Sequence, residues 1–216
     1  MQLDIPAGEF AGYIFDLDGT LVDTMPLHYR AWNEAMRRAG LQEKLSEDLF
    51  YSFGGVPTRK VAELLGLHYG LAIDVDHVFH QKEALFVELQ SEMQLIGPVV
   101  DFARRVAQKF PVSVASGGPR LIVRGTLERV GLAGLFPVVV TPEDVKHGKP
   151  APDMFLLAAE RMEVPAAQCL VFEDAEPGIK AAEAAGMKCV HVPSRTNDKG
   201  RIRPMELSDR DGPILI

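Results

Sequence analysis

The sequence feature that most constrains this chain is a pair of aspartates, Asp16 and Asp18, at the end of an apolar segment. Residues 10–15 are rich in aromatic and apolar β-formers, which predicts a short strand that ends where the aspartates begin. Alternate residues of a strand point the same way, so the two carboxylates would crowd each other, and Gly19 lets the chain turn away. Close carboxylates are costly without a cation or a shared proton. The pair therefore indicates a divalent metal ion, with at least one carboxylate taking part in chemistry.

An alternation of helices and short apolar strands occupies the second half of the chain. We expect helices over 98–109, 119–130, 152–162 and 176–185, and strands over 112–115, 138–140, 169–172 and 188–192. Short, continuously apolar strands that alternate with helices are typical of parallel sheets covered on both faces. The pattern predicts an α/β fold whose core is a doubly wound, Rossmann-like parallel sheet.

A block of helical segments interrupts this alternation after the first strand. Helices are expected over 27–39, over 46–53, from Pro57 onward and over 74–94, with no convincing strand among them. We therefore expect an inserted α-helical cap, residues 24–94, above the carboxyl edge of the sheet. The α/β core would then be discontinuous, built from residues 1–23 and 95–193. Residues 194–216 show no periodicity and are expected to form a mobile tail.

Composition excludes several classes of partner. The chain has 216 residues, a net charge of −7 and a pI of about 5.4, so nucleic acid is not an expected partner. No stretch is long enough to span a membrane, and the acidic N-terminal segment lacks the basic region of a signal peptide. Cys169 and Cys189 lie in apolar runs and are expected to be buried, reduced thiols. These observations predict a cytoplasmic protein.

Chemically reactive side chains also follow the later strands. Ser116 and the backbone of Gly117 precede a helix N-terminus, a position that favours anions. Lys149 stands in a rigid proline-containing turn ahead of another helix, and Glu173 and Asp174 follow the strand 169–172. Each motif alone also suits an ordinary strand–helix turn, but ligands of open parallel sheets bind at the edge where all of them would meet. Hydrogen-bond donors that can bind an anion, next to a carboxylate cluster suited to Mg²⁺, predict a phosphoryl-transfer site.

These segments resemble a known family. FDLDGTLVDT, the serine of VASGGP, the lysine of GKPAPDMF and VFEDAEPGI resemble, in order, the four motifs of the haloacid dehalogenase-like hydrolases. The resemblance is closest to the β-phosphoglucomutase and fructose-1-phosphate phosphatase-like branch and covers roughly residues 10–193. It implies that Asp16 is a nucleophile that forms an aspartyl-phosphate. It also implies that Asp18 is a general acid and then a base, so we expect the surroundings of Asp18 to raise its pKa.

The resemblance also implies ligands for a metal ion and for a phosphoryl group. Mg²⁺ would be held by the carboxylates of Asp16 and Asp174 and by the backbone carbonyl of Asp18. Glu173 would be a further ligand or would bond to one of the ligands. The transferring phosphoryl group would be bound by Ser116, backbone amides near Gly117, and Lys149.

The expected cap would close over the site, exclude water and determine specificity. His28 and Trp32 lie four residues apart on one expected helix and so share a face. The segment TMPLHYRAW resembles the same stretch of that branch, where such a histidine, a glycine loop and a cap lysine face the substrate. The register leaves open which of two adjacent basic residues enters the site. The candidate substrate-facing residues are Thr24, His28, Trp32, Gly55, Arg59, Lys60 and Lys82.

The sequence thus predicts a magnesium-dependent phosphatase of a small phosphorylated metabolite, in the first place a sugar phosphate, that is a monomer or a weak dimer. The alternative is a phosphomutase of the β-phosphoglucomutase type, which passes the phosphoryl group to a second sugar hydroxyl instead of water. Thr20 favours hydrolysis, because the mutase branch often has a small apolar residue there. A remoter alternative is a non-catalytic, ligand-binding member of the fold.

Overall fold

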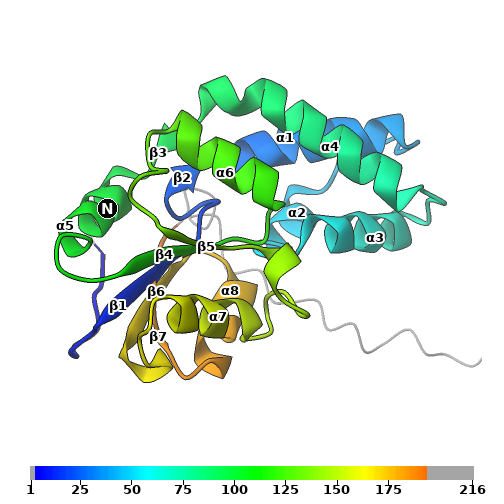
Figure 1. Cartoon of the computed structure of the whole chain (residues 1–216). Coiled ribbons are helices and arrows are strands. Elements are labelled where there is room, and N and C mark those ends of the chain that lie inside the picture. Colours follow the sequence, from blue (N-terminus) through cyan, green and yellow to red (C-terminus); the bar gives the residue numbers. More distant parts are fainter. Residues whose placement is uncertain (1–2, 194–216) are drawn as a thin grey trace, which may run out of the picture.

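The computed structural model describes residues 3–193, and the predicted tail 194–216 lies outside the described residues. A five-stranded sheet, in which all neighbouring strands are parallel, forms the centre of the core (Figure 1). In spatial order its strands are β5 (Val138–Val140), β4 (Val112–Ala115), β1 (Gly12–Phe15), β6 (Cys169–Glu173) and β7 (Lys188–His191). The prediction of an α/β parallel sheet is confirmed, and β1 lies at its centre.

Two pairs of helices cover the two faces of this sheet. They are α5 (Gly97–Val106) and α6 (Arg120–Arg129) on one face, and α7 (Asp153–Arg161) and α8 (Glu176–Ala184) on the other. The alternation of side chains along β1 explains the division. Tyr13 and Phe15 pack in the apolar cluster that includes α5 and α6, whereas Ile14 packs in the cluster that includes α7 and α8. Burial on both faces accounts for the continuously apolar strands of the sequence.

Four helices form a separate layer above the carboxyl ends of the strands (Figure 1). They are α1 (Met25–Arg38), α2 (Glu47–Ser52), α3 (Thr58–Tyr69) and α4 (Val75–Leu89), and we call them the cap. The cap has its own apolar cluster, which includes Trp32, Met36, Phe50 and Leu65. The long helices α1 and α4 pack against each other.

The chain enters and leaves the cap through a short two-stranded antiparallel sheet. Its strands are β2 (Val22–Asp23) and β3 (Gln94–Leu95). The sequence predicted one helix over 74–94, but α4 ends at Leu89 and is followed by a 3₁₀ turn, Gln90–Glu92. Strands of two residues are too short to leave a period in the sequence, so this sheet was not predicted.

Two further 3₁₀ turns, Pro142–Asp144 and Ala166–Gln168, complete the described elements. Neither cysteine forms a disulfide, and Cys169 is fully buried whereas Cys189 is only partly so. No helix within residues 3–193 combines the length and the apolar character needed to cross a membrane.

Candidate active site

The two aspartates of the opening motif lie at the carboxyl end of β1, directly below the cap. Asp16 continues the ladder, because its backbone N–H donates to the carbonyl of Phe172 on β6. Gly19 then turns the chain with a φ of +88°, a conformation that side chains rarely adopt. A Cβ at Gly19 would also overlap the carboxylate of Asp174. Glycine is therefore required here both by the turn and by the close approach of an acidic side chain.

Three buried carboxylates converge at this turn. Oxygen atoms of Asp16, Glu173 and Asp174 all lie within 4.8 Å of one another. The ammonium of Lys149 lies between two of them, 2.6 Å from Oδ1 of Asp16 and 2.6 Å from Oε1 of Glu173. It also donates to the carbonyl of Ala115 at 3.0 Å. The lysine is thereby fixed by three acceptors at the point where β1, β4 and β6 end.

Burial and mutual repulsion change the acidity of this cluster. Burial, together with Glu173 and Asp18, raises the pKa of Asp16 to about 8, although Lys149 opposes the shift. Burial, with Glu173 and Asp16, also raises the pKa of Asp174 well above its usual value. Burial alone would lower the pKa of Lys149, but Asp16 and Glu173 raise it, so the ammonium stays charged.

The donor set fits a magnesium ion. Three buried carboxylates surround one ammonium, and the remaining negative charge is what a divalent cation neutralises. Carboxylate oxygens are the ligands that Mg²⁺ prefers. The hydroxyl of Thr20 donates to Asp174 at 3.4 Å and helps to orient it. The resemblance implied the backbone carbonyl of Asp18 as a further ligand, which stays a prediction. The Asp18 carboxylate faces other partners.

Asp18 bonds instead to the cap. Its Oδ1 accepts a hydrogen bond from the hydroxyl of Thr24 at 2.6 Å and lies 3.1 Å from Nε2 of His28. Its Oδ2 accepts one from the hydroxyl of Ser116 at 3.4 Å. Burial would raise the pKa of Asp18, but His28, Thr24 and Lys82 lower it to about 2. The expectation of a raised pKa is therefore wrong for this arrangement, because cap residues stabilise the carboxylate.

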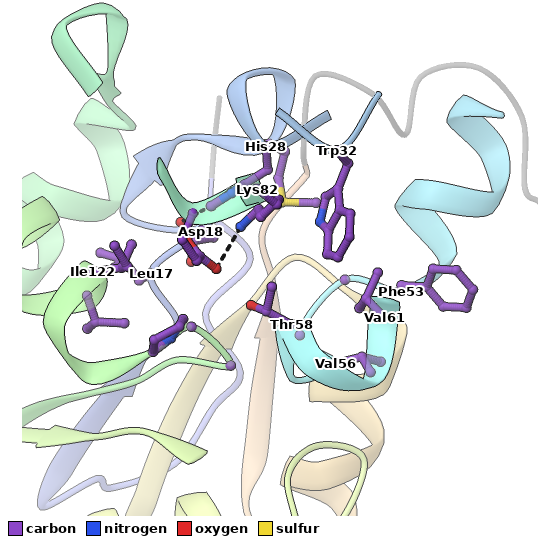
Figure 2. A pocket seen from close by; sticks show the side chains of 18 of the residues that line it. Leu17, Asp18, His28, Trp32, Phe53, Val56, Thr58, Val61, Lys82 and Ile122 are labelled. Carbon is purple, nitrogen blue, oxygen red and sulfur yellow. Dashed lines mark hydrogen bonds and ion pairs between the residues drawn. The ribbon is translucent and has the colours of Figure 1, made fainter. Parts of the chain in front are cut away.

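His28 is the donor in this contact. Burial and the nearby Lys82 lower its pKa, although Asp18 and Glu83 oppose the shift. Because a carboxylate oxygen is an acceptor, we assign the proton of this contact to Nε2, which donates to Asp18. The ring stacks on Phe86 of α4, with centroids 3.8 Å apart and planes at 12°. Figure 2 shows His28 and Lys82 beside Asp18, with Trp32 on the same side of the pocket but farther from Asp18.

The predicted phosphate loop meets a glycine loop of the cap. The Gly118 N–H donates to the hydroxyl of Ser116 at 3.2 Å, which holds that side chain at the start of the loop. A Cβ at Gly117 would lie 2.6 Å from the carbonyl oxygen of Gly55, and one at Gly54 would lie 2.6 Å from Cβ of Ala175. The Gly117–Gly55 contact between core and cap is therefore made by backbone atoms, and a Cβ at either Gly117 or Gly54 would clash.

A cavity of about 70 Å³ lies between these two layers. Its floor includes Asp16, Asp18 and the loop 117–119. The cap side is largely apolar and is lined by Met25, Trp32, Phe50, Phe53, Val56 and Val61. Its polar cap residues are His28, Thr58, Lys82 and Glu83. Of the predicted cap residues, His28, Trp32, Gly55 and Lys82 line this cavity, and Thr24 bonds to Asp18 beside it.

Arg59 and Lys60 do not reach the site, so their prediction as substrate-facing residues is wrong. Both are exposed on α3, where Arg59 pairs with Asp76 and stacks on a ring of α4, and Lys60 pairs with Glu63 at 2.7 Å. Helix α3 begins at Thr58, whose side chain faces the cavity (Figure 2). The next two residues are rotated away from it by the helical turn of about 100° per residue.

Sequence reasoning also missed residues of the cavity wall. Phe50 and Phe53 belong to the short helix α2 and its end, where six residues give too few turns to define a face. Glu83 follows the predicted Lys82 directly, and adjacent helical positions do not normally share a face. Both Lys82 and Glu83 are nevertheless buried against the cavity, and they pair at 3.0 Å.

Comparison with known proteins agrees with this geometry. The family model for haloacid dehalogenase-like hydrolases matches residues 10–186. A fructose-1-phosphate phosphatase of Escherichia coli is 39% identical over 85% of this chain and 96% of its own length. A phosphorylated carbohydrates phosphatase of Thermotoga maritima is 31% identical over 82% of each chain.

A solved β-phosphoglucomutase of Clostridium difficile shares the fold, with a TM-score of 0.76 and 24% identity, over 88% of this chain and 87% of its own. The sequence motifs, the parallel sheet and the similarity to these proteins all point to the same family. The chain belongs to the haloacid dehalogenase-like hydrolases.

Proposed function

We propose that this chain hydrolyses the phosphoric monoester of a small phosphorylated metabolite, in the first place a sugar phosphate, through an aspartyl-phosphate on Asp16. The observation that carries the proposal is that Asp16, which is bonded to Lys149, and Asp18 lie together at the floor of one covered cavity. A nucleophile, a fixed cation and a second carboxylate are the groups that phosphoryl transfer requires. The names of the phosphatases described above support a phosphorylated carbohydrate as substrate.

Binding of the phosphoryl group would use groups that the core already holds in place. The ammonium of Lys149, the hydroxyl of Ser116 and the N–H groups of the loop 117–118 lie around Asp16 and Asp18. Each is a hydrogen-bond donor, and phosphoryl oxygens are acceptors. Asp16, Asp174 and Glu173, with the carbonyl of Asp18 proposed as a further ligand, would hold Mg²⁺, which when bound supplies positive charge against the phosphoryl oxygens.

The reaction would proceed in two transfers. In the first, a carboxylate oxygen of Asp16 bonds to phosphorus, the bond from phosphorus to the ester oxygen breaks, and Asp18 protonates the leaving oxygen. In the second, Asp18 takes a proton from water, the water oxygen bonds to phosphorus, and the Asp16–phosphorus bond breaks to release phosphate. With a pKa of about 2 Asp18 is ionised but is a weak base, and the negative charge of a bound phosphoryl group would raise that pKa toward the range that both the acid and the base roles need.

A phosphomutase remains the second candidate, because the chemistry of the first transfer is the same. A mutase must hold a sugar whose other end already carries a phosphoryl group, and that end faces the cap. Within the described residues, the one lysine or arginine that lines the cavity from the cap is Lys82, and Glu83 neutralises it. This favours hydrolysis over transfer to a second sugar hydroxyl.

A phosphate-release assay with Mg²⁺ over a panel of sugar monophosphates tests the proposal. The panel includes fructose 1-phosphate, glucose 6-phosphate and β-glucose 1-phosphate, and glucose 6-phosphate formation is followed for the last. Free phosphate from the wild type, lost in Asp16→Asn and kept in Asp101→Asn on the exposed side of α5, supports the hydrolase. Conversion of β-glucose 1-phosphate without free phosphate makes the mutase correct. Binding of sugar phosphates without any turnover supports the non-catalytic alternative.

A further inference from the structure

Glu83 presents a carboxylate oxygen that the protein itself leaves unpaired. The residue is 7% exposed and lines the cavity between cap and core. Its Oε1 accepts a hydrogen bond from Lys82 at 3.0 Å, whereas its Oε2 is buried and has no partner among the described residues. A buried acceptor without a donor is destabilising, and few are found in native proteins. The position therefore suits a hydrogen-bond donor brought in by a ligand.

The charges around Glu83 indicate which kinds of ligand group can occupy this position. Lys82 is held against the rings of Trp32 and Phe86, with Nζ 5.7 Å and 5.3 Å from the ring centroids, and Glu83 cancels its charge. In the part of the chain that the structure describes, no other lysine or arginine lines the cap side of the cavity. A carboxylate or a second phosphoryl group placed there would meet an unpaired acidic oxygen and no free cation.

An uncharged hydroxylated group is not repelled by the acidic oxygen of Glu83 and does not need a cation. A hydroxyl donates to a carboxylate oxygen, and charge-assisted bonds of this kind are roughly twice as strong as neutral ones. The apolar wall formed by Trp32, Phe50 and Phe53 offers a surface for the C–H face of a sugar or polyol. Glu83 and this wall line the same cavity, so one could bind a hydroxyl of a hydroxylated chain and the other its C–H groups.

We propose that Glu83 is a specificity-determining residue whose Oε2 accepts a hydrogen bond from a hydroxyl at the non-phosphorylated end of the substrate. The substrate class is then a sugar or polyol with a single phosphoryl group. Sugar bisphosphates and phosphorylated carboxylic acids are rejected. This inference rests on the proposed phosphatase function and adds to it the residue that selects among phosphate esters.

The test compares kcat/KM for three esters in the wild type and in Glu83→Gln. The esters are the best sugar monophosphate of the panel, fructose 1,6-bisphosphate and 2-phosphoglycolate. We expect the wild type to prefer the monophosphate. In Glu83→Gln the acceptor loses its charge and Lys82 loses its partner. The ratio of kcat/KM for the monophosphate to that for each of the other two is expected to fall about tenfold or more, mainly through KM.

A matched control and a second variant separate this role from a structural one. Glu88→Gln changes an exposed acid of the same helix and is expected to keep the wild-type ratios. If Glu83→Gln does not fold, Glu83→Asp serves instead, because it keeps the charge but draws the oxygens back by one methylene. It is expected to lower the same ratios. A variant that loses activity equally on all three esters, with unchanged ratios, overturns the proposal.

The outcomes for the two proposals differ. A wild type that hydrolyses none of the esters contradicts the phosphatase proposal, and the inference about Glu83 fails with it. A wild type that hydrolyses esters but prefers the bisphosphate or phosphoglycolate leaves the phosphatase proposal standing and overturns the role of Glu83.

Discussion

Nε2 of His28, on the first cap helix, lies 3.1 Å from Oδ1 of Asp18, at the end of the central strand of the core. The imidazole is stacked on Phe86, so its position is set by the packing of α1 against α4. The proposed general acid and base is therefore oriented by the cap and not by the core alone. The contact that orients Asp18 therefore exists only when the cap lies closed over the core.

Replacing His28 with asparagine is expected to lower kcat by about 10–100-fold, which is less than the roughly 10²–10⁴-fold that a proton-transfer group itself contributes, because Asp18 remains but is less well oriented. The shorter amide cannot span the 3.1 Å contact from the same backbone position, so Asp18 loses one of its two cap partners. Steady-state kinetics on the best substrate measures the effect, and His77→Asn, on the exposed face of α4, is the control. A kcat within twofold of the wild type would show that His28 does not orient Asp18.

The backbone contact between Gly117 and Gly55 gives a second prediction. A methyl group at position 117 would lie 2.6 Å from the Gly55 carbonyl oxygen, closer than real Cβ atoms come to other heavy atoms. Gly117→Ala is therefore expected to keep the cap from seating and to lower kcat/KM at least tenfold. Because the clash is relieved when the cap moves away, the melting temperature is expected to change little.

The matched control for this prediction is Gly125→Ala. Gly125 lies in the middle of α6, and a Cβ there would meet nothing within 4 Å. Alanine at an open helical position stabilises by about 0.5–1 kcal/mol relative to glycine. We expect wild-type kinetics and a slightly raised melting temperature. Equal kinetic losses in both variants would mean that cap closure does not depend on the Gly117 contact.

The sequence allowed the core to be predicted because its signals are local. Each strand of the parallel sheet is a short apolar run, and the residues that follow it carry the chemistry, so Asp16, Lys149, Glu173 and Asp174 could be expected together. The strand ends meet at one sheet edge for topological reasons, which do not depend on the details of side-chain packing.

The contacts made by the cap could not be predicted in the same way. Whether Thr58 or Arg59 enters the cavity depends on where α3 begins, because a shift of one residue rotates each side chain about the helix axis by about 100°. The low pKa of Asp18 arises from His28 and Thr24, whose contacts exist because cap and core meet. Glu83 was missed because its burial depends on the packing of α4 against α1 and not on its spacing.

The carboxylate cluster predicts a stabilising effect of magnesium. A ligand that binds only the folded state at a hundredfold excess over its Kd adds about 2.7 kcal/mol to the free energy of unfolding. For a chain of this size we expect Mg²⁺ to raise the melting temperature by about 5–10 °C over that in EDTA. Asp174→Asn removes one of the three clustered carboxylates and is expected to abolish most of this rise. Differential scanning calorimetry with and without Mg²⁺ measures it.

Asp101→Asn is the control for the magnesium effect, because it removes one exposed carboxylate far from the cluster in sequence. Its thermal shift is expected to equal that of the wild type. If Asp174→Asn kept the full shift, the ion would be bound elsewhere, and the assignment of Asp16, Glu173 and Asp174 would be incorrect.

Asp144 predicts a dependence of stability on pH. Its Oδ1 accepts a hydrogen bond from Arg161 at 2.6 Å, and its Oδ2 lies 2.9 Å from Nη2 of Arg120, the first residue of α6. Burial would raise the pKa of Asp144, but Arg161, Arg120 and the backbone N–H of Thr141 lower it. The pair Asp144–Arg120 thus ties the end of β5 to the helix that follows the phosphate loop.

A carboxyl whose folded pKa is below its unfolded value of about 3.9 adds stability above that value and loses it as the pH falls through the folded pKa. Asp144→Asn is therefore expected to lower the free energy of unfolding at pH 7 by about 1 kcal/mol, since both arginines are partly exposed. The difference from the wild type should narrow below about pH 4. Urea unfolding at pH 7 and pH 3 measures both values, with Glu128→Gln on exposed α6 surface as the control. A difference that is the same at both pH values would mean that Asp144 stabilises the loop by its shape and hydrogen bonds and not by its charge.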